Sequence, residues 1–248
     1  MTTDLGLDGR HLLLTGAGGL GKALTIEALA AGMRATVLDR DPKALAELPT
    51  DGRVRALEAD LTEVASFAAL LADVVAAAGP IDAFVPTAAV IRRQHELPEV
   101  TVADWDLQVA VNQKSVYFLT RDVAEHMKGH GGGAIVLVSS VAGVTGGVQG
   151  TTVYGSTKAA VLATTHGFAR LYAASGVRIN AVVPGTMDTP LLWVGQTPES
   201  ASAAAGLCAM GRVGRPVEIA RPILFLLSQW ASFITGTALD VDGGWLFR

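Results

Sequence analysis

The chain has 248 residues, of which half are hydrophobic, 17% are charged and 28 are glycine, a composition typical of one globular unit rich in small side chains. Its net charge of −4 and pI near 5.7 provide no basic field, so we expect no nucleic-acid partner. No apolar run approaches the ~20 residues that span a bilayer, so we also expect no membrane partner.

The single cysteine, Cys208, excludes an intrachain disulfide. Cysteine and histidine show no metal-ligand spacing, so we expect no metal. Residues 1–4 lack the charged stretch, apolar run and cleavage site of a signal peptide. Together these features predict a protein of the reducing cytoplasm.

Short apolar runs alternate with longer segments in which apolar residues recur at three- and four-residue steps, a pattern that predicts βαβ units. The predicted strands are His11–Thr15, Ala35–Asp39, Val54–Glu58, Ile81–Val85, Ala134–Ser139, Arg178–Val183 and Ala238–Val241. The predicted helices are Gly21–Ala31, Thr62–Ala78, Val102–Met127, Ser156–Ala174 and Val217–Ser228. Because such strands are apolar on both faces, we expect an α/β fold, a single doubly wound parallel sheet with helices on both faces. Ligands bind such sheets beyond the carboxyl ends of the strands.

A glycine-rich turn follows the first strand, in the sequence Thr15-Gly-Ala-Gly-Gly-Leu-Gly21, and opens a helix. Glycines let the backbone approach a pyrophosphate and leave free N–H groups at the positive end of the helix dipole. A tight strand–helix connection is the structural alternative. The position after the first strand of a βαβ unit favours dinucleotide binding.

Asp39 ends the second predicted strand. A carboxylate at this place accepts hydrogen bonds from the adenosine ribose of NAD and repels the 2′-phosphate of NADP. Arg40 acts in the opposite direction, because an arginine can pair with that phosphate. The alternative for Asp39 is a cap for the turn that leads to Pro42. The sequence favours NAD, with NADP as the less favoured cofactor.

Tyr154 and Lys158 are four residues apart, so a phenol and an ammonium share one face of a helix. The phenol pKa must fall by roughly 3 units, about 4 kcal/mol, to act near neutrality. A cation about 5 Å away supplies about 3 kcal/mol of this. Ser140 closes the strand before it, toward the ligand crevice. Asn112 is a poor helix former inside a long helix, where its side chain could hold a water or a freed carbonyl.

The motifs occur in a recognisable order: the glycine-rich turn, Asp39, Asp60-Leu61, Asn112, Ser140, Tyr154, Lys158, Pro184-Gly185, Thr189 and Val241-Asp-Gly-Gly244. From about Gly9 to the C-terminus this order closely resembles the single-domain short-chain dehydrogenase/reductases. The resemblance implies a Rossmann-like domain over residues 1–248 and an NAD(P)-dependent alcohol dehydrogenase or ketone reductase.

The resemblance also implies a role for each catalytic residue. Tyr154 would be the acid/base, and Lys158 would lower its pKa and hold the nicotinamide ribose. Ser140 would position the substrate oxygen, and Asn112 would support a proton-relay water. Members of the family assemble as tetramers through their long helices and C-terminal residues, so we expect a homotetramer.

A cofactor site follows from the same resemblance. Asp60 and Leu61 would flank the adenine, and the Thr189 hydroxyl would donate to the nicotinamide carboxamide. The expected cofactor contacts are Thr15, Gly16, Gly19, Leu20, Gly21, Asp39, Arg40, Asp60, Leu61, Ala88, Tyr154, Lys158, Pro184, Gly185 and Thr189.

Three features depart from the family pattern. The turn is one residue short between Gly16 and Gly19, which predicts fewer N–H groups for the pyrophosphate and weak cofactor binding. Pro86-Thr-Ala-Ala89 stands where the family has Asn-Asn-Ala-Gly, which removes amide side chains and puts a methyl beside the expected cofactor. Pro222 is expected to interrupt the last helix, because an interior proline costs about 3 kcal/mol.

The segment Leu191–Met210 has one charged residue, Glu199, among many small apolar ones. The family resemblance makes it the substrate lid, and its composition favours an apolar ring or chain as substrate. A short helix packed against the body is the alternative reading of its alanines.

Arg92, Arg93 and His95 follow the fourth predicted strand, on the crevice side. We expect a solvated charged loop here. An arginine that pointed inward would instead hold a substrate carboxylate, as a dihydrodiol-carboxylate-type dehydrogenase requires. A cofactor-binding protein without turnover is a further alternative, supported only by the altered turn and the Pro86 segment.

Overall fold

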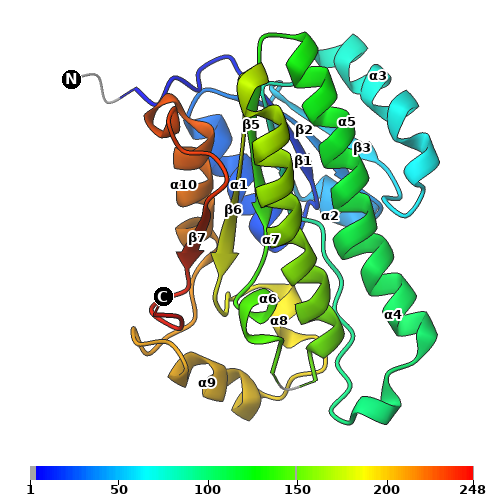
Figure 1. Ribbon diagram of the computed structural model, residues 1–248, viewed down its shortest axis with the longest axis vertical. Coiled ribbons are helices and arrows are strands. Elements are labelled where there is room, and N and C mark those ends of the chain that lie inside the picture. The colour runs from blue at the N-terminus through cyan, green and yellow to red at the C-terminus, as the bar shows by residue number, and fades with distance from the viewer. Residues whose placement is uncertain (1–3, 149, 248) are drawn as a thin grey trace.

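In the computed structural model, which describes residues 4–148 and 150–247, seven parallel strands form one sheet with helices on both faces (Figure 1). The strands are β1 (His11–Thr15), β2 (Arg34–Asp39), β3 (Val54–Glu58), β4 (Ala83–Pro86), β5 (Gly133–Val138), β6 (Val177–Pro184) and β7 (Ala238–Val241). Their order across the sheet is β3-β2-β1-β4-β5-β6-β7. The predicted doubly wound, Rossmann-like α/β fold is confirmed.

The sheet places its ligand crevice between β1 and β4. The chain builds outward from β1 in one direction and then from β4 in the other, so the strand order reverses between them. Ligands of doubly wound folds bind at the carboxyl ends of the strands at such a reversal. Thr15 pairs with Pro86 at the last position of this ladder, so the turns after the two strands lie side by side.

Two layers of helices cover the sheet, because successive residues of each central strand point to opposite faces. In β1, Leu12 and Leu14 belong to one buried core and Leu13 belongs to the other. The first core is covered by α1 (Gly19–Ala30), α2 (Pro42–Ala46) and α10 (Pro216–Leu227). The second is covered by α3 (Phe67–Ala78), α5 (Ser115–Gly129) and α7 (Thr152–Tyr172).

Shorter elements gather at the carboxyl end of the sheet. They are α6 (Ala142–Thr145), α8 (Pro190–Trp193) and α9 (Pro198–Gly206), and Figure 1 shows them together below the strand ends. Within the described ranges, no helix is both long and apolar enough to cross a membrane.

Four predicted helices differ most from the structure. Helix α3 begins at Phe67 instead of Thr62, after a 3₁₀ turn at Val64–Ser66. The predicted helix over 102–127 is α4 (Val102–Val109), a π-helical turn at Ala110–Lys114, and α5. Helix α7 begins at Thr152, four residues early, so Tyr154 lies in its first turn. Helix α10 runs through Pro222, so the predicted interruption is wrong. Its buried apolar face, with Ile219 and Ile223, packs against the sheet and offsets the lost hydrogen bond.

Candidate active site

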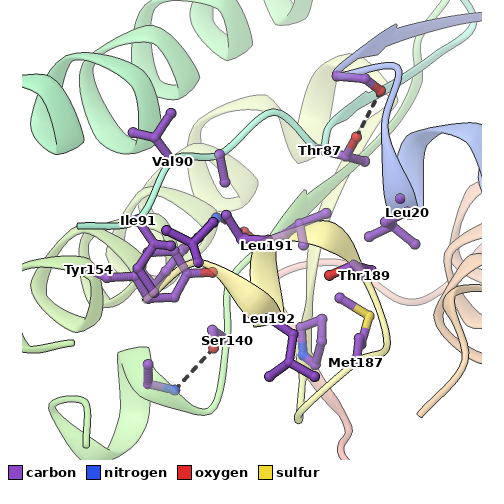
Figure 2. Close-up of a pocket in the computed structure, with 18 of the residues that line it drawn as sticks. Leu20, Thr87, Val90, Ile91, Ser140, Tyr154, Met187, Thr189, Leu191 and Leu192 are labelled. Carbon is purple, nitrogen blue, oxygen red and sulfur yellow. Dashed lines mark hydrogen bonds between the residues drawn. The ribbon is translucent and has the colours of Figure 1, made fainter. Parts of the chain in front are cut away.

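A cavity of about 480 Å³ lies at the carboxyl ends of the strands (Figure 2). The predicted site residues that line it are Gly16, Gly19, Leu20, Asp39, Arg40, Asp60, Leu61, Ala88, Ser140, Tyr154, Lys158, Pro184, Gly185 and Thr189. Three predicted residues, Thr15, Gly21 and Asn112, are not part of the lining. Sequence motifs far apart in the chain thus share one cavity.

The glycine-rich turn is shaped by close backbone approaches. Gly16 has a φ of 90°, and a Cβ on it would lie 2.7 Å from the Ala88 nitrogen. A Cβ on Gly21 would overlap the Gly16 carbonyl oxygen. Gly21 therefore does not line the cavity, but the turn needs a glycine at this position because the Gly16 carbonyl leaves no room for a side chain. The N–H groups of Gly19 and Leu20, in the first turn of α1, have no partner within the helix and are available at the cavity wall.

Thr87 ties the segment after β4 to this turn. Its hydroxyl donates to the Thr15 carbonyl at 2.7 Å. It also lies 3.3 Å from the Gly16 carbonyl, the contact marked by a dashed line at Thr87 in Figure 2. The Pro86–Ala89 segment lacks the amide side chains of the family pattern, but the Thr87 hydroxyl supplies a link between the two turns. Thr15, although it does not line the cavity, contributes the carbonyl that holds this link.

Asp39 is bonded to the main chain on both oxygens. Oδ2 accepts the Ala17 N–H at 2.7 Å, and Oδ1 accepts the Asp41 N–H at 2.9 Å. The turn cap that was the alternative for Asp39 is therefore present. A carboxylate oxygen can accept more than one hydrogen bond, so the carboxylate can still accept ribose hydroxyls.

Arg40 and Asp60 stand beside Asp39 in the lining. The pKa of Asp60 is lowered, first by hydrogen bonds from Thr62 and then by the nearby Arg40 cation. Arg40 itself is exposed. This wall of the cavity therefore carries both signs of charge.

Tyr154 and Ser140 meet in the cavity. Figure 2 shows the Tyr154 hydroxyl directed into the space between Ser140 and Leu191. The Ser140 hydroxyl oxygen accepts the Ala142 N–H at 3.1 Å. Burial raises the pKa of Tyr154 to about 12, against the opposing effects of a hydrogen bond with Ser140 and the Arg93 cation. The phenol is therefore protonated at neutral pH.

Lys158 is buried one helical turn further along α7. Its Nζ donates to the Val138 carbonyl at 2.9 Å and lies 5.5 Å from the centre of the Tyr154 ring. Burial lowers the pKa of Lys158 to about 8. The predicted pairing of phenol and ammonium is present, but the predicted fall of the phenol pKa is not found in the protein alone. Burial of the phenol outweighs the hydrogen bond with Ser140 and the charge of Arg93, which act against it.

Asn112 lies in the π-helical turn and faces the loop after β4 instead of the cavity. Its Nδ2 donates to the Val90 carbonyl at 2.8 Å, and its Oδ1 accepts the Val90 N–H at 2.8 Å. Nδ2 also lies 3.3 Å from the Thr157 hydroxyl. The side chain thus clamps Val90, which lines the cavity, and so positions the wall beside Tyr154.

The sequence left the place of Arg93 open and did not assign some other lining residues to the site. Arg93 lines the cavity and is half-buried, so the expected solvated loop is wrong for Arg93, although Arg92 and His95 are exposed. Met187 and Trp245 also line it. Trp245 directly follows the Val241-Asp-Gly-Gly244 motif, a position that could have been predicted. Nothing in the local sequence distinguishes Arg93 from Arg92.

This geometry agrees with the comparisons to known proteins. A family model described as enoyl-(acyl carrier protein) reductase matches residues 16–246. The chain belongs to the short-chain dehydrogenase/reductase family. The resemblance drawn from the motifs is thereby confirmed, and the protein is an oxidoreductase of a family that uses nicotinamide cofactors.

One relative and two solved structures indicate how close the similarity is. The chain is 38% identical over 186 residues to cis-4-hydroxycyclohexanecarboxylate dehydrogenase of Sinomonas cyclohexanicum, covering 75% of this chain and 74% of that protein. The structure described as "Crystal structure of gox2181" has a TM-score of 0.92 at 30% identity, covering 98% and 97% of the two chains. The structure described as "ElxO with NADP Bound" has a TM-score of 0.87 at 28% identity, covering 97% and 100%.

The residues of the cavity fit a nicotinamide dinucleotide. Gly18 has nothing within 4 Å of the position where a Cβ would lie, so the turn leaves open space at the start of α1. Two lining residues suit the two ribose groups of the cofactor. The Asp39 carboxylate can accept hydrogen bonds from the adenosine ribose, and the Lys158 ammonium can donate one to the nicotinamide ribose. Thr189 offers a hydroxyl, which Figure 2 shows directed toward the cavity.

Proposed function

We propose that this protein uses NAD to interconvert a secondary alcohol and its ketone on an apolar or cyclic substrate. The observation that carries the proposal is that Ser140 and Tyr154 share one cavity with the apolar side chains of Ile91, Leu191 and Leu192 (Figure 2). A bound nicotinamide supplies the carbon that gives or accepts the hydride. The polar pair holds the reacting oxygen, and the apolar side chains hold the rest of the substrate.

Each polar side chain then has one task. The Tyr154 hydroxyl oxygen takes the proton from the alcohol or returns it to the ketone. Ser140 donates a hydrogen bond to the same substrate oxygen. The buried ammonium of Lys158 favours the phenolate form of Tyr154. The pKa of Tyr154 is about 12 in the protein alone, and a bound oxidised nicotinamide would add positive charge that favours the phenolate.

NAD is proposed over NADP because of Asp39. Its carboxylate ends β2 and lines the cavity, where it would repel a 2′-phosphate. NADP is kept as the less favoured alternative for two reasons. Arg40 lines the cavity next to Asp39 in the sequence, and one structural neighbour is described with NADP bound.

We propose that residues 191–210 form the substrate lid of a single dinucleotide-binding domain over 1–248. Leu191, Leu192, Val194 and Ala204 from this segment line the cavity. A cyclic substrate is further supported by the relative from Sinomonas cyclohexanicum, whose name gives a cyclohexane ring. A cytoplasmic location suits the free, buried thiol of Cys208.

The test is turnover of a panel of cyclic and open-chain secondary alcohols with NAD, followed by the absorbance of NADH. Tyr154→Phe should lower the rate about 100-fold or more while calorimetry still shows NAD binding, because the phenol oxygen acts on the substrate. Lys158→Ala should impair both turnover and NAD binding. A Tyr154→Phe rate above about a tenth of wild type removes Tyr154 from the mechanism. NAD binding without turnover of any alcohol would favour the non-catalytic alternative.

A further inference from the structure

Arg93 brings a positive charge into the substrate end of the cavity. It follows β4, lines the cavity beside Ile91 and is half-buried, whereas Arg92 is exposed. Its charge reaches Tyr154, because the Arg93 cation lowers the pKa of that phenol. The guanidinium therefore lies within electrostatic reach of the group proposed to transfer the proton.

The lid holds Arg93 in place. Its Nε donates to the Val194 carbonyl at 2.7 Å, and a terminal nitrogen lies 3.5 Å from the Leu192 carbonyl. These contacts fix the side chain before a ligand arrives, which reduces the entropy lost on binding. A guanidinium has more N–H donors than these contacts use, so donors remain for a ligand.

Arg93 lacks a carboxylate partner within ion-pair distance among residues 4–148 and 150–247, whereas Arg92 lies 3.8 Å from Asp104. A half-buried cation without a counter-charge is unfavourable, and an anionic ligand would remove that penalty. The neighbouring wall is apolar and includes Ile91, Leu192 and Val194. This end of the cavity therefore suits an apolar group that carries an anion.

We propose that Arg93 binds a carboxylate of the substrate, which makes the substrate class an apolar ring with a secondary alcohol at one end and a carboxylate at the other. This role rests on the proposed function, which places the alcohol at Ser140 and Tyr154. A guanidinium fork binds a carboxylate through two parallel hydrogen bonds, so it orients the ring as well as attracting it. Arg93 then sets selectivity, while Tyr154 carries out proton transfer.

The experiment compares kcat/KM with NAD for three alcohols: 4-hydroxycyclohexanecarboxylate, its methyl ester and cyclohexanol. Wild type should prefer the carboxylate over the ester about tenfold or more, as expected for hydrogen bonds to a charged group. Arg93→Gln should bring this ratio close to one, and Arg93→Lys should restore part of it. Arg92→Gln is the matched control, because Arg92 is exposed and paired with Asp104, and it should keep the wild-type ratio.

Two outcomes would overturn the role of Arg93 while leaving the proposed function intact. One is a wild-type protein that oxidises the ester and cyclohexanol as well as the carboxylate. The other is an Arg93→Gln variant that slows all three alcohols by the same factor, since Arg93 then only latches the lid. Failure of wild type on these three and on every alcohol of the panel is instead a failure of the proposed function.

A second measurement uses only the wild-type protein and so tests the role of Arg93 even if the Arg93 variants do not fold. Cyclohexanecarboxylate and cyclohexanecarboxamide are compared as inhibitors of wild-type cyclohexanol oxidation. About tenfold stronger inhibition by the carboxylate supports the role of Arg93. Equal inhibition contradicts it.

Discussion

The Asp39 carboxylate accepts the Ala17 N–H at 2.7 Å and so links the end of β2 to the glycine-rich turn. The turn is one residue shorter than the family pattern, and this hydrogen bond occupies one of its amides. The residue expected to select the cofactor thus also holds the turn expected to bind the pyrophosphate. Substitutions at Asp39 must separate these two effects.

Asp39→Asn and Asp39→Ala separate charge from shape. Asparagine keeps an oxygen that can accept the Ala17 N–H but removes the charge, so NADP binding should gain relative to NAD. The discrimination lost should be about 2 kcal/mol or more. Alanine should also lower the ratio of NAD affinity to NADP affinity. In addition it should weaken NAD binding, because the turn loses the hydrogen bond between Asp39 and the Ala17 N–H. Calorimetry with both cofactors measures this. Equal affinity of wild type for NAD and NADP would mean that Arg40 outweighs Asp39.

Insertion of one glycine after Ala17 tests the short turn itself. If the turn presents too few N–H groups to the pyrophosphate, the inserted residue should add one and so strengthen NAD binding. Each hydrogen bond to a charged group contributes about 1.5–3 kcal/mol. Calorimetry again provides the measurement, and one glycine inserted after Gly52, in an exposed turn remote from the cavity, serves as control. Weaker NAD binding would show that Asp39 already shapes the short turn well.

Thr87 offers a test of the link between the turns after β1 and β4. Thr87→Val removes the hydroxyl that donates to Thr15 but keeps the side-chain shape, so we expect a loss of about 1 kcal/mol in the free energy of unfolding. NAD binding should weaken several-fold, because the glycine-rich turn loses a support. Thr87→Ser keeps the hydroxyl and should stay close to wild type in urea denaturation and calorimetry. Equal effects of valine and serine would contradict a role for the hydroxyl.

Local pattern was sufficient for several strands, and the family resemblance named many of the residues that line the cavity. β1, β3 and β7 have their predicted bounds, because an apolar run between turn residues contains the needed information. The predicted start of the fourth strand at Ile81 is two residues early. There the Ile81 N–H bonds to His126 and the Asp82 carboxylate accepts the His11 N–H, which are contacts between distant residues.

The site roles that the sequence left open or missed also depend on contacts between distant residues. Thr87 acts on a carbonyl 72 residues away, and Arg93 acts on one 101 residues away. Asn112 was correctly singled out as unusual in a helix, but its partner Val90 became visible only in the fold. A role that depends on contact with a distant segment of the chain cannot be predicted from the residue spacing within one segment.

Assembly can be tested on the exposed apolar side chains. We expect a homotetramer built through the long helices and the C-terminal residues, where Leu171 on α7 is 71% exposed and Phe247 is 85% exposed. Light scattering at micromolar concentration should give a tetramer, and Leu171→Glu should give smaller species, because a charge would be buried. Ile26→Glu on α1, outside these elements, is the control. A stable wild-type monomer would rule out the assembly.

The buried ammonium of Lys158 predicts a pH-dependent stability. Its pKa is about 8 in the folded protein and 10.5 ordinarily, so between these values the unfolded chain holds more protons. Stability from this group therefore rises with pH from 8 to 10.5, and the burial penalty is fully present below pH 8. In urea denaturation, Lys158→Met should gain stability over wild type at pH 7, with the difference changing by up to about 3 kcal/mol by pH 10.5. Other titrating groups are common to both proteins and cancel. A difference independent of pH would show that the ammonium carries no burial penalty.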